Sequence, residues 1–319
     1  MVIEVAAAVI ERADGAFLLA RRPAGKVYAG WWEFPGGKIG DAETPETALA
    51  RELHEELGID VRRAYPWITR VFAYPHATVR LNFFRVVEWS GEAHPQEGQA
   101  IVWQRLDATT AEPMLPANAP VLASLALPQE YAITSAQTMG VDAMLAQLER
   151  RLRAGLKLVQ VREPGMAGFE RDRFTAQVVA MAHRHGCKVL VKSPFPDTDG
   201  IHFTASQLMA LDARPKQPLV AASCHTREEL DRAMNLEMDF AVLGPVRTTT
   251  THGSVQPLGW EGFEKLARGA SIPVYAIGGL TREDLGRACT CGAHGLAMIR
   301  GSWNGSITRP RPSPAHRPG

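Results

Sequence analysis

The stretch GKIGDAETPETALARELHEELGI, residues 37–59, decides the fold of the first part of this chain. Within it, Gly37 is followed after five residues by Glu43, and after seven more by the pair Arg51-Glu52. The pair Glu55-Glu56 and then a glycine complete a pattern that extends over 23 positions. The spacing of these residues predicts both a local structure and a chemistry.

The middle of the stretch carries the signals of an amphipathic helix. Thr44 can cap the helix through its hydroxyl, and Pro45 suits the first turn, where a missing N–H costs nothing. Apolar residues then follow near helical spacing, at Ala48, Leu49, Leu53 and Leu57. Gly58 is a natural stop for the helix. We therefore predict a helix that begins after Thr44 and ends before Gly58.

The glutamates of this helix indicate a metal site. Glu52, Glu55 and Glu56 lie at positions i, i+3 and i+4, so they crowd one face and repel one another unless a positive group lies among them. Hard divalent cations take oxygen ligands, and Mg²⁺ pairs a few carboxylates with substrate phosphates. Arg51 and Glu43 can brace the cluster through charge-assisted hydrogen bonds. The alternative is an ordinary solvated acidic helix.

With Gly36 and Gly37 before it, this stretch resembles the Nudix box, and residues 1–127 resemble MutT-type Nudix hydrolases. These enzymes cleave oxidised nucleoside triphosphates such as 8-oxo-dGTP. The resemblance extends to residues 18–22, 32–38, 97–99 and 116–121. Strand-like runs at residues 4–11, 16–20, 67–74 and 79–87 predict a mixed sheet between helices, an α/β/α sandwich. The resemblance implies the same α/β fold, in a domain of residues 1–128. It also implies attack of water on phosphorus with Mg²⁺, or alternatively Mn²⁺, and release of a nucleoside monophosphate and pyrophosphate.

The resemblance assigns roles to individual residues. The catalytic and metal-binding groups would be the carboxylates of Glu52, Glu55, Glu56 and Glu97 and the carbonyl of Gly36. Arg22 would meet a substrate phosphate, since a guanidinium pairs well with anionic oxygens. The strand formed by Glu33, Phe34, Pro35 and Gly36 would pass beside the nucleotide. Asn118 would read a purine edge with its amide donor and acceptor, the alternative being a loop-capping residue.

The length and composition of the chain limit the number of domains, the kind of partner and the location that we expect. The 319 residues are too many for one ordinary core and suit two domains. A net charge of +1 gives no basic surface for a nucleic-acid polymer, and the Nudix resemblance implies a small-molecule nucleotide as the partner. No apolar run reaches the roughly 20 residues of a membrane helix, and no signal segment opens the chain. The four cysteines suit reduced thiols and a cytoplasmic location, and no feature specifies an oligomeric state.

Beyond a boundary near residues 127–130, strand-like runs alternate with amphipathic helices. The runs are residues 131–134, 158–162, 188–191, 200–202, 219–223, 240–243, 273–276 and 295–298. Eight such units predict a compact (β/α)₈ TIM barrel over residues 131–303. Residues 304–319 are rich in Pro, Arg and Ser, so we predict a disordered tail.

The barrel region resembles thiamine-phosphate synthases and their TenI relatives. The matching segments are residues 159–163, 200–203, 223–225, 243–246, 249–251 and 276–280. They supply a candidate ligand site, most of it at strand ends, formed by Gln160, Arg162, His225, Thr249, Thr251, Gly278 and Gly279. Gly278 and Gly279 can bring backbone N–H groups close to a phosphate.

Four departures from the synthase pattern lie in this region. Pro164 and His252 replace two phosphate-binding lysines, and Lys192-Ser193 and Gln207 replace metal-binding carboxylate positions. We therefore do not expect synthesis of thiamine phosphate. The barrel is then a ligand-binding module, a TenI-like thiazole tautomerase in which His225 or His252 moves a proton, or a structural partner of the Nudix half. His202 is expected to be structural.

For the whole chain, the pattern favours a pyrophosphohydrolase that converts 8-oxo-dGTP to 8-oxo-dGMP and pyrophosphate. Removal of this mispairing precursor would place the protein in DNA repair, DNA damage control and DNA replication fidelity. The competing enzymatic hypothesis is a Nudix hydrolase of damaged thiamine diphosphate, and the non-enzymatic hypothesis is a ligand-sensing regulator. The complete set of box glutamates argues against a sensor.

Overall fold

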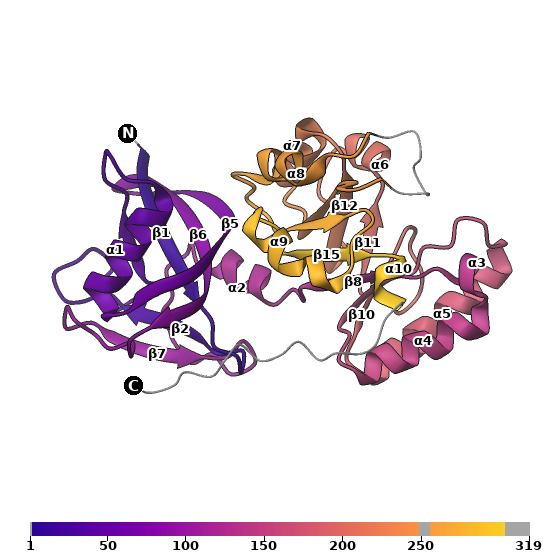
Figure 1. The fold of residues 1–319 in the computed structure, drawn as a ribbon, viewed down its shortest axis with the longest axis horizontal. Helices are drawn as coiled ribbons and strands as arrows, with labels where there is room; N and C mark the ends of the chain where they lie inside the picture. Colours follow the sequence, from indigo (N-terminus) through magenta and orange to yellow (C-terminus); the bar gives the residue numbers. More distant parts are fainter. Residues whose placement is uncertain (1, 249–255, 304–319) are drawn as a thin grey trace. The chain divides into compact units, whose positions relative to one another are not determined.

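The computed structural model describes residues 2–248 and 256–303 (Figure 1). The chain divides into two compact units, of which the first ends at Leu127 and the second begins at Pro128. The predicted tail, Thr249, Thr251 and His252 lie outside the described residues. Within the described ranges, no helix combines the length and the apolar character that a membrane crossing requires.

The first unit contains two β-sheets. One has four strands in the order β4 (Gly36–Lys38), β1 (Val2–Ile10), β6 (Ala77–Ser90) and β5 (Asp60–Tyr74). The other has three strands in the order β3 (Trp32–Glu33), β2 (Phe17–Arg21) and β7 (Ala100–Gln104). β1 runs parallel to β6 and antiparallel to β4, so the larger sheet is mixed.

Two helices of this unit pack into separate cores because successive side chains of β1 point to opposite faces of its sheet. The first core joins β1 to helix α1 (Pro45–Leu57) through Ala6, Ala8, Ile10, Ala48, Leu49, Leu53 and Leu57. The second core includes Ala7, Val9, Phe17, Phe34, Phe83 and, from helix α2 (Ala119–Leu125), Val121. The predicted α/β/α sandwich is confirmed.

One correction concerns the β layer, which consists of two sheets rather than the single mixed sheet that we predicted. The chain leaves one sheet at β3 and enters the other at β4, and Phe34 and Pro35 make this passage. Pro35 has no N–H to extend a ladder of hydrogen bonds. The polypeptide therefore changes sheets directly before the box.

The second unit is a closed barrel of eight parallel strands. In chain order these are β8 (Glu130–Ile133), β9 (Leu158–Gln160), β10 (Lys188–Val191), β11 (Gly200–Phe203), β12 (Leu219–Cys224), β13 (Phe240–Leu243), β14 (Val274–Ile277) and β15 (Gly295–Met298). Each strand pairs with the next, and β15 pairs with β8 to close the barrel. The predicted (β/α)₈ barrel is confirmed, and β10, β13 and β15 have the predicted bounds.

Helices connect the strands of the barrel (Figure 1). They are α3 (Ala136–Met139), α4 (Val141–Arg153), α5 (Gly168–Arg184), α6 (Ala205–Met209), α7 (Arg227–Asn235), α8 (Gly259–Ala267), α9 (Leu285–Thr290) and α10 (Arg300–Trp303), with a 3₁₀ turn, η2 (Arg282–Asp284). The amphipathic helices predicted between the strands include α4 and α7. All four cysteines lie in this unit and are buried, and they form no disulfide.

Aromatic rings fill the centre of the barrel. Tyr131, Phe240 and Tyr275 are fully buried. The ring centroid of Phe240 lies 5.2 Å from that of Tyr131 and 5.0 Å from that of Tyr275. The imidazole of His202 stacks on Tyr131 at 5.7 Å. Offset and edge-on contacts of this kind pack the barrel interior densely. Of this layer, His202 also lines the cavity described below.

Candidate functional site

The box helix forms as its sequence predicts. The hydroxyl of Thr44 accepts a hydrogen bond from the N–H of Thr47 at 3.2 Å, and Pro45 occupies the first turn. Gly58 adopts the left-handed conformation with φ of 68°, and its N–H returns to the carbonyl of His54. The apolar residues predicted from the spacing, Ala48, Leu49, Leu53 and Leu57, are all buried. Their burial leaves the glutamates and Arg51 at the edge of the core.

Two glycines let β4 pass between β1 and the glutamates of α1. A Cβ atom at Gly36, where φ is 141°, would lie 2.1 Å from the carbonyl oxygen of Ala6. A Cβ atom at Gly37 would lie 2.1 Å from the carboxylate of Glu52. The N–H of Gly36 donates a hydrogen bond to Oε2 of Glu56 at 3.2 Å. The glycine pair therefore holds the carboxylates of Glu52 and Glu56 against one short segment of backbone.

Arg51 braces the other side of the cluster. Its Nε and Nη2 donate to the two carboxylate oxygens of Glu43 at 2.7 and 2.8 Å. Its Nη1 donates to Glu52 at 2.8 Å and to Glu55 at 3.2 Å. The hydrogen bonds from Arg51 lower the pKa of Glu43 to about 2. The predicted pairing of Arg51 with Glu43 is confirmed, and the same guanidinium also reaches two further glutamates of the box.

Negative charge accumulates around Glu56. The pKa of Glu56 is raised to about 7, chiefly by burial and also by the carboxylates of Glu33, Glu52 and Glu97, while the hydrogen bond from the Gly36 N–H opposes the rise. A buried carboxylate with anionic neighbours disfavours its own charged form. A divalent cation with oxygen ligands would reverse this effect, so the residues present fit the metal that the Nudix resemblance implies.

The predicted metal ligands are brought together only in part. Glu52 and Glu56 meet at the glycine pair, whereas Glu55 is half exposed and bonds to Arg51. Glu97 forms an ion pair with Lys26 at 3.2 Å, in which both side chains are about half exposed. Among the described residues, no group of three or more His, Cys, Asp or Glu side chains is arranged as a metal cluster. Arg51 and Lys26 are the cations that hold the outer two carboxylates.

A glutamine that sequence reasoning left without a role joins Glu56 to Glu97. Gln99 is buried, and its Oε1 accepts a hydrogen bond from the N–H of Glu97 at 2.8 Å. Its Nε2 donates to the carbonyl of Glu56, also at 2.8 Å. Gln99 therefore fixes the loop that carries Glu97 to the end of the box helix. The available signal was the Glu-Gly-Gln match at residues 97–99.

Arg22, directly after β2, lies next to Glu33 at the end of β3. Nη1 of Arg22 contacts both carboxylate oxygens of Glu33 at 2.7 and 2.8 Å, and its Nε donates to the carbonyl of Val27 at 2.7 Å. Burial raises the pKa of Glu33, while Arg22 and Lys26 oppose the rise. Arg22, predicted to meet a phosphate, is here the counter-ion of a predicted substrate-binding residue.

The side chains of Phe34 and Pro35 are buried. The ring of Phe34 lies 6.0 Å from Phe17 and 5.9 Å from Phe83 and is 4% exposed, so it is enclosed by other side chains. The carbonyl of Pro35 accepts a hydrogen bond from the N–H of Ala8 at 2.8 Å. These two residues position the neighbouring Glu33 and Gly36.

Asn118 is buried at the start of α2. Its side chain does not cap the helix, which is contrary to the loop-capping alternative. Instead Nδ2 makes a long hydrogen bond of 3.4 Å to the carbonyl of Trp32, next to Glu33. Asn118 is thereby tied to the strand that carries the predicted substrate-binding residues.

A group of aromatic side chains that was not predicted from sequence lies near Asn118 and Glu33. The ring of Tyr28 lies 5.2 Å from Trp31, 5.5 Å from Tyr74 and 6.0 Å from His76. Burial raises the pKa of Tyr74, which forms a hydrogen bond with the backbone of Ala117 and is close enough to Glu33 to feel its charge. The rings of Trp31, Tyr74 and His76 are inclined to the ring of Tyr28 by 66°, 55° and 50°, so they form a tilted aromatic cluster beside the predicted substrate-binding residues.

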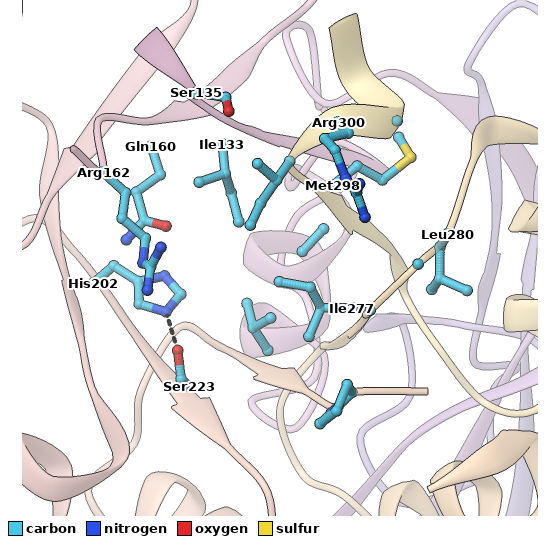
Figure 2. Close-up of a pocket in the computed structure, with 18 of the residues that line it drawn as sticks. Ile133, Ser135, Gln160, Arg162, His202, Ser223, Ile277, Leu280, Met298 and Arg300 are labelled. Atoms are coloured by element: carbon cyan, nitrogen blue, oxygen red, sulfur yellow. Dashed lines mark hydrogen bonds between the residues drawn. The ribbon is translucent and has the colours of Figure 1, made fainter. Parts of the chain in front are cut away.

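The barrel contains a cavity of about 740 Å³ at the carboxyl ends of its strands (Figure 2). Five of the predicted ligand residues line it, namely Gln160, Arg162, His225, Gly278 and Gly279. Thr249 and Thr251 lie outside the described residues. The remaining lining is largely apolar, for example Ile133, Ile277 and Met298. The size suits a small organic molecule.

The two cavity histidines have different surroundings. His202 is buried between Tyr131 and Ser223, with Nδ1 3.0 Å from the Tyr131 hydroxyl and Nε2 2.9 Å from Oγ of Ser223. Burial lowers the pKa of His202 to about 3. His225 is more exposed, and its Nδ1 lies 3.2 Å from the carboxylate of Glu229 on α7. His202 packs against Tyr131 as expected of a structural residue, and it also lines the cavity.

Comparison with known proteins gives matches to each half of the chain. A protein-family model described as NUDIX domain matches residues 6–124, and one described as thiamine monophosphate synthase matches residues 130–301. An 8-oxo-dGTP diphosphatase of Haemophilus influenzae is 40% identical over 121 residues, which are 38% of this chain and 89% of the relative.

Two further relatives differ in their activity. A CTP pyrophosphohydrolase of Escherichia coli is 40% identical over 120 residues, 38% of this chain and 88% of the relative. A thiamine-phosphate synthase of Streptococcus suis is 30% identical over 184 residues, 54% of this chain and 80% of the relative. The first relative matches the unit with the box, and the second matches the barrel.

Proposed function

Since the chain belongs to the Nudix family over residues 6–124 and to the thiamine monophosphate synthase family over residues 130–301, we propose that its first unit is a nucleoside triphosphate pyrophosphohydrolase. The proposed reaction converts 8-oxo-dGTP to 8-oxo-dGMP and pyrophosphate. The relative from Haemophilus influenzae named for this activity supports the proposal. The activity belongs to a Nudix domain of residues 1–128, separate from a barrel domain of residues 131–303.

The main support for the proposal is the group of carboxylates next to Gly36 and Gly37. Glu56 has a pKa raised to about 7 by burial and by Glu33, Glu52 and Glu97. Glu52, Glu56 and the Gly36 carbonyl would hold Mg²⁺, or alternatively Mn²⁺, and Glu55 and Glu97 are the additional ligands. When bound, the metal supplies charge compensation for the phosphates and a water of lowered pKa.

The remaining residues of the site bind and orient the substrate. Arg22 and Lys26 lie beside Glu33 and provide positive charge for phosphate oxygens. Arg51 keeps the carboxylates of Glu52 and Glu55 in place through its hydrogen bonds. Positioning and charge stabilisation account for most of phosphoryl-transfer catalysis, so no nucleophilic side chain is required.

The base would lie between Asn118 and the aromatic group of Tyr28 and Tyr74. An amide offers a donor and an acceptor to the edge of a purine. A base without the matching pattern would leave buried polar groups unpaired, which is how such sites reject near-isosteres. Because Asn118 is 3% exposed, this selection takes place in a largely dry environment.

A second candidate substrate is CTP, since a CTP pyrophosphohydrolase has the same 40% identity to this chain as the 8-oxo-dGTP diphosphatase. Damaged thiamine diphosphate is a third, suggested by the attached barrel. We favour the oxidised purine because aromatic side chains lie close to Asn118, where they would contact a base that the amide reads. The proposed setting is the cytoplasmic nucleotide pool, where hydrolysis would protect DNA replication, and the partner is a small molecule rather than a nucleic-acid polymer.

The experiment is a comparison of kcat/KM for 8-oxo-dGTP, dGTP, CTP and oxidised thiamine diphosphate on the full-length protein with Mg²⁺. We expect 8-oxo-dGTP to lead by at least about tenfold, which is about 1.4 kcal/mol of transition-state binding. A lead of that size for CTP or for the thiamine compound would replace the proposed substrate. Asn118→Ala should remove the preference for the oxidised purine while retaining hydrolysis of dGTP.

A further inference from the structure

We propose that Gln99 is a positioning residue for the hydrolysis and that it acts through Glu97. The inference rests on the proposed function, in which Glu97 is an additional metal ligand outside the box. Gln99 would hold the backbone of Glu97 at a fixed place on the C-terminal end of α1, next to Glu56. Three features support this role: the free carbonyls of the helix end, the burial of the Gln99 amide and the weakness of the ion pair that Glu97 forms.

The C-terminal end of α1 offers carbonyl groups that the helix itself cannot pair. The last four carbonyls of an α-helix have no N–H partner within the helix. The carbonyl of Leu57 accepts a hydrogen bond from the N–H of His94 at 3.1 Å. The carbonyl of Glu56 accepts one from the N–H of Gln96 at 3.0 Å. The segment that leads to Glu97 is therefore docked on the end of the box helix through its backbone.

The side chain of Gln99 adds a second connection to the same helix end. Its Nε2 donates to the Glu56 carbonyl at 2.8 Å, and its Oε1 accepts a hydrogen bond from the N–H of Glu97, also at 2.8 Å. Gln99 is 6% exposed, so water has little access to these hydrogen bonds, which are stronger in such surroundings than in water. One amide group thereby joins the backbone of Glu97 to the backbone of Glu56.

Gln99 is itself anchored by the strand that follows it. β7 begins at Ala100, which pairs with Arg21 on β2. Because this pairing fixes the backbone of β7, the Gln99 amide is attached to a strand rather than to the middle of a loop. Groups supported by strands and helices are held more precisely than groups on loops. Gln99 therefore lies between a fixed strand and the box helix, where its side chain can set the position of Glu97.

The carboxylate of Glu97 has a much weaker contact than its backbone. Its ion pair with Lys26 is 3.2 Å long, and both side chains are about half exposed. Exposed ion pairs of this kind contribute little to stability and are screened by salt. The negative charge of Glu97 nevertheless reaches Glu56, whose pKa it helps to raise. We infer that the buried amide of Gln99, and not Lys26, determines how Glu97 lies relative to Glu56.

A second buried glutamine provides a matched control. Gln104 lies at the other end of β7 and is also 6% exposed. Its Oε1 accepts a hydrogen bond from a backbone N–H, that of Thr110, at 2.6 Å. Gln99→Met and Gln104→Met each remove one buried amide from an end of the same strand. The first removes a connection to Glu97, whereas the second does not.

The first measurement is Mn²⁺ binding by the full-length protein without nucleotide, followed by the paramagnetic resonance signal of the free ion. We expect Gln99→Met to weaken Mn²⁺ binding by about tenfold, as Glu97→Gln should, because residues that orient a metal ligand affect metal affinity to this extent. Gln104→Met should bind Mn²⁺ as wild type does. Unchanged binding in Gln99→Met, or an equal loss in Gln104→Met, would overturn the proposal.

The second measurement is a double-mutant cycle on kcat for 8-oxo-dGTP with Mg²⁺. If Gln99 acts through Glu97, Gln99→Met should lower kcat by about tenfold in the wild-type background. In the Glu97→Gln background the same substitution should change kcat by less than about twofold, since the group that it positions is already gone. Equal factors in the two backgrounds would show that Gln99 acts independently of Glu97.

Gln99→Asn serves as a second test variant in case Gln99→Met does not fold, which a circular-dichroism melting curve would show. Its amide stands on a side chain one methylene shorter, so we expect it to lose one of the two hydrogen bonds and the same Mn²⁺ affinity. A wild-type protein that binds Mn²⁺ but leaves 8-oxo-dGTP intact would contradict the proposed substrate, and the Mn²⁺ titration would then decide the role of Gln99. Absence of Mn²⁺ binding by wild type would contradict both proposals.

Discussion

The two units of this protein concentrate charge of opposite sign. In the first unit, carboxylates gather on Gly36 and Gly37 until the pKa of Glu56 rises to about 7. In the second, Arg162 and Lys192 share a cavity whose described lining has no carboxylate. An excess of like charge in a partly buried site raises the free energy of the folded protein unless a group of opposite charge binds there. The comparison indicates a cation as the missing component of the first site and an anion as that of the second.

The largest effect is expected at the box. Glu56→Gln or Glu52→Gln keeps the shape of the side chain but removes a charged ligand, so kcat for 8-oxo-dGTP should fall by at least about 10³-fold, or ~4 kcal/mol. Glu46→Gln is the matched control, because Glu46 is an exposed residue in the first turn of the same helix. A kcat close to that of wild type in either test variant would contradict the assignment.

Substitution of Gly36 should mainly lower the free energy of unfolding, whereas substitution of Gly37 should mainly lower kcat. In Gly36→Ala the new Cβ meets backbone at Ala6 and φ is 141°, so we expect a loss of about 3 kcal/mol in the free energy of unfolding. In Gly37→Ala the three atoms nearest to the Cβ belong to the side chain of Glu52, which can move away. That variant should remain folded and lose about 10²-fold in kcat.

Urea denaturation and steady-state kinetics measure these two quantities. Gly286→Ala serves as the control, because a Cβ there meets nothing within 4 Å. Full activity in Gly37→Ala would show that the position of the Glu52 carboxylate is unimportant.

The buried histidine of the barrel gives the stability a pH dependence. The pKa of His202 is about 3 in the folded protein against 6.5 when exposed, so below pH 6.5 the unfolded chain binds a proton that the folded chain does not. The contribution of neutral His202 to the free energy of unfolding is therefore fully present above pH 6.5 and decreases as the pH falls. Between pH 7 and pH 5 the loss is about 2 kcal/mol.

Chemical denaturation at both pH values, compared between wild type and His202→Gln, isolates this contribution. The measured quantity is the difference in slope, so a lower absolute stability of the variant does not matter. Equal pH slopes in the two proteins would contradict the assignment of a neutral, buried imidazole.

The smallest effects concern the helix caps of the two units. Thr44 caps α1 and Thr226 caps α7 in the same way, each hydroxyl accepting a backbone N–H at 3.2 Å. Removal of such a cap costs about 1 kcal/mol. Hydrogen exchange measured by mass spectrometry should be about fivefold faster in α1 for Thr44→Ala and in α7 for Thr226→Ala. Faster exchange in the helix of the other unit would show that the units are coupled.

Local patterns were sufficient to predict the box helix and the barrel. The spacing of Leu49, Leu53 and Leu57 defines a buried helical face, and Gly58 can adopt the left-handed conformation that ends it. In the barrel, buried parallel strands produce compact apolar runs, which is why β10, β13 and β15 were found with their observed bounds.

Contacts between distant residues could not be predicted in this way. Gln99 reaches Glu56 across 43 positions, and Lys26 reaches Glu97 across 71. Tyr28 and Tyr74 meet because a loop and the end of β5 converge, which no periodicity encodes. β7 is a five-residue strand without a clear alternation of buried and exposed positions, so it was also missed.

Lys192 illustrates a different limit. In the sequence, Lys192 was recognised only as a residue that replaces a carboxylate of the synthase pattern. The sequence was compared with that pattern and not with the neighbours of Lys192 in space. The structure places it on a cavity with Arg162, where the substitution changes the sign of the local charge. A departure from a family pattern therefore gains meaning once the neighbours of the substituted residue are known.

The most direct test of the central claim is the hydrolysis of 8-oxo-dGTP by full-length protein with Mg²⁺, after chelation with EDTA, and after Mg²⁺ is restored. We predict turnover with Mg²⁺, a decrease of at least about 10³-fold on chelation, and full recovery. Intact 8-oxo-dGTP in the presence of Mg²⁺, or equal turnover after chelation, would contradict the account.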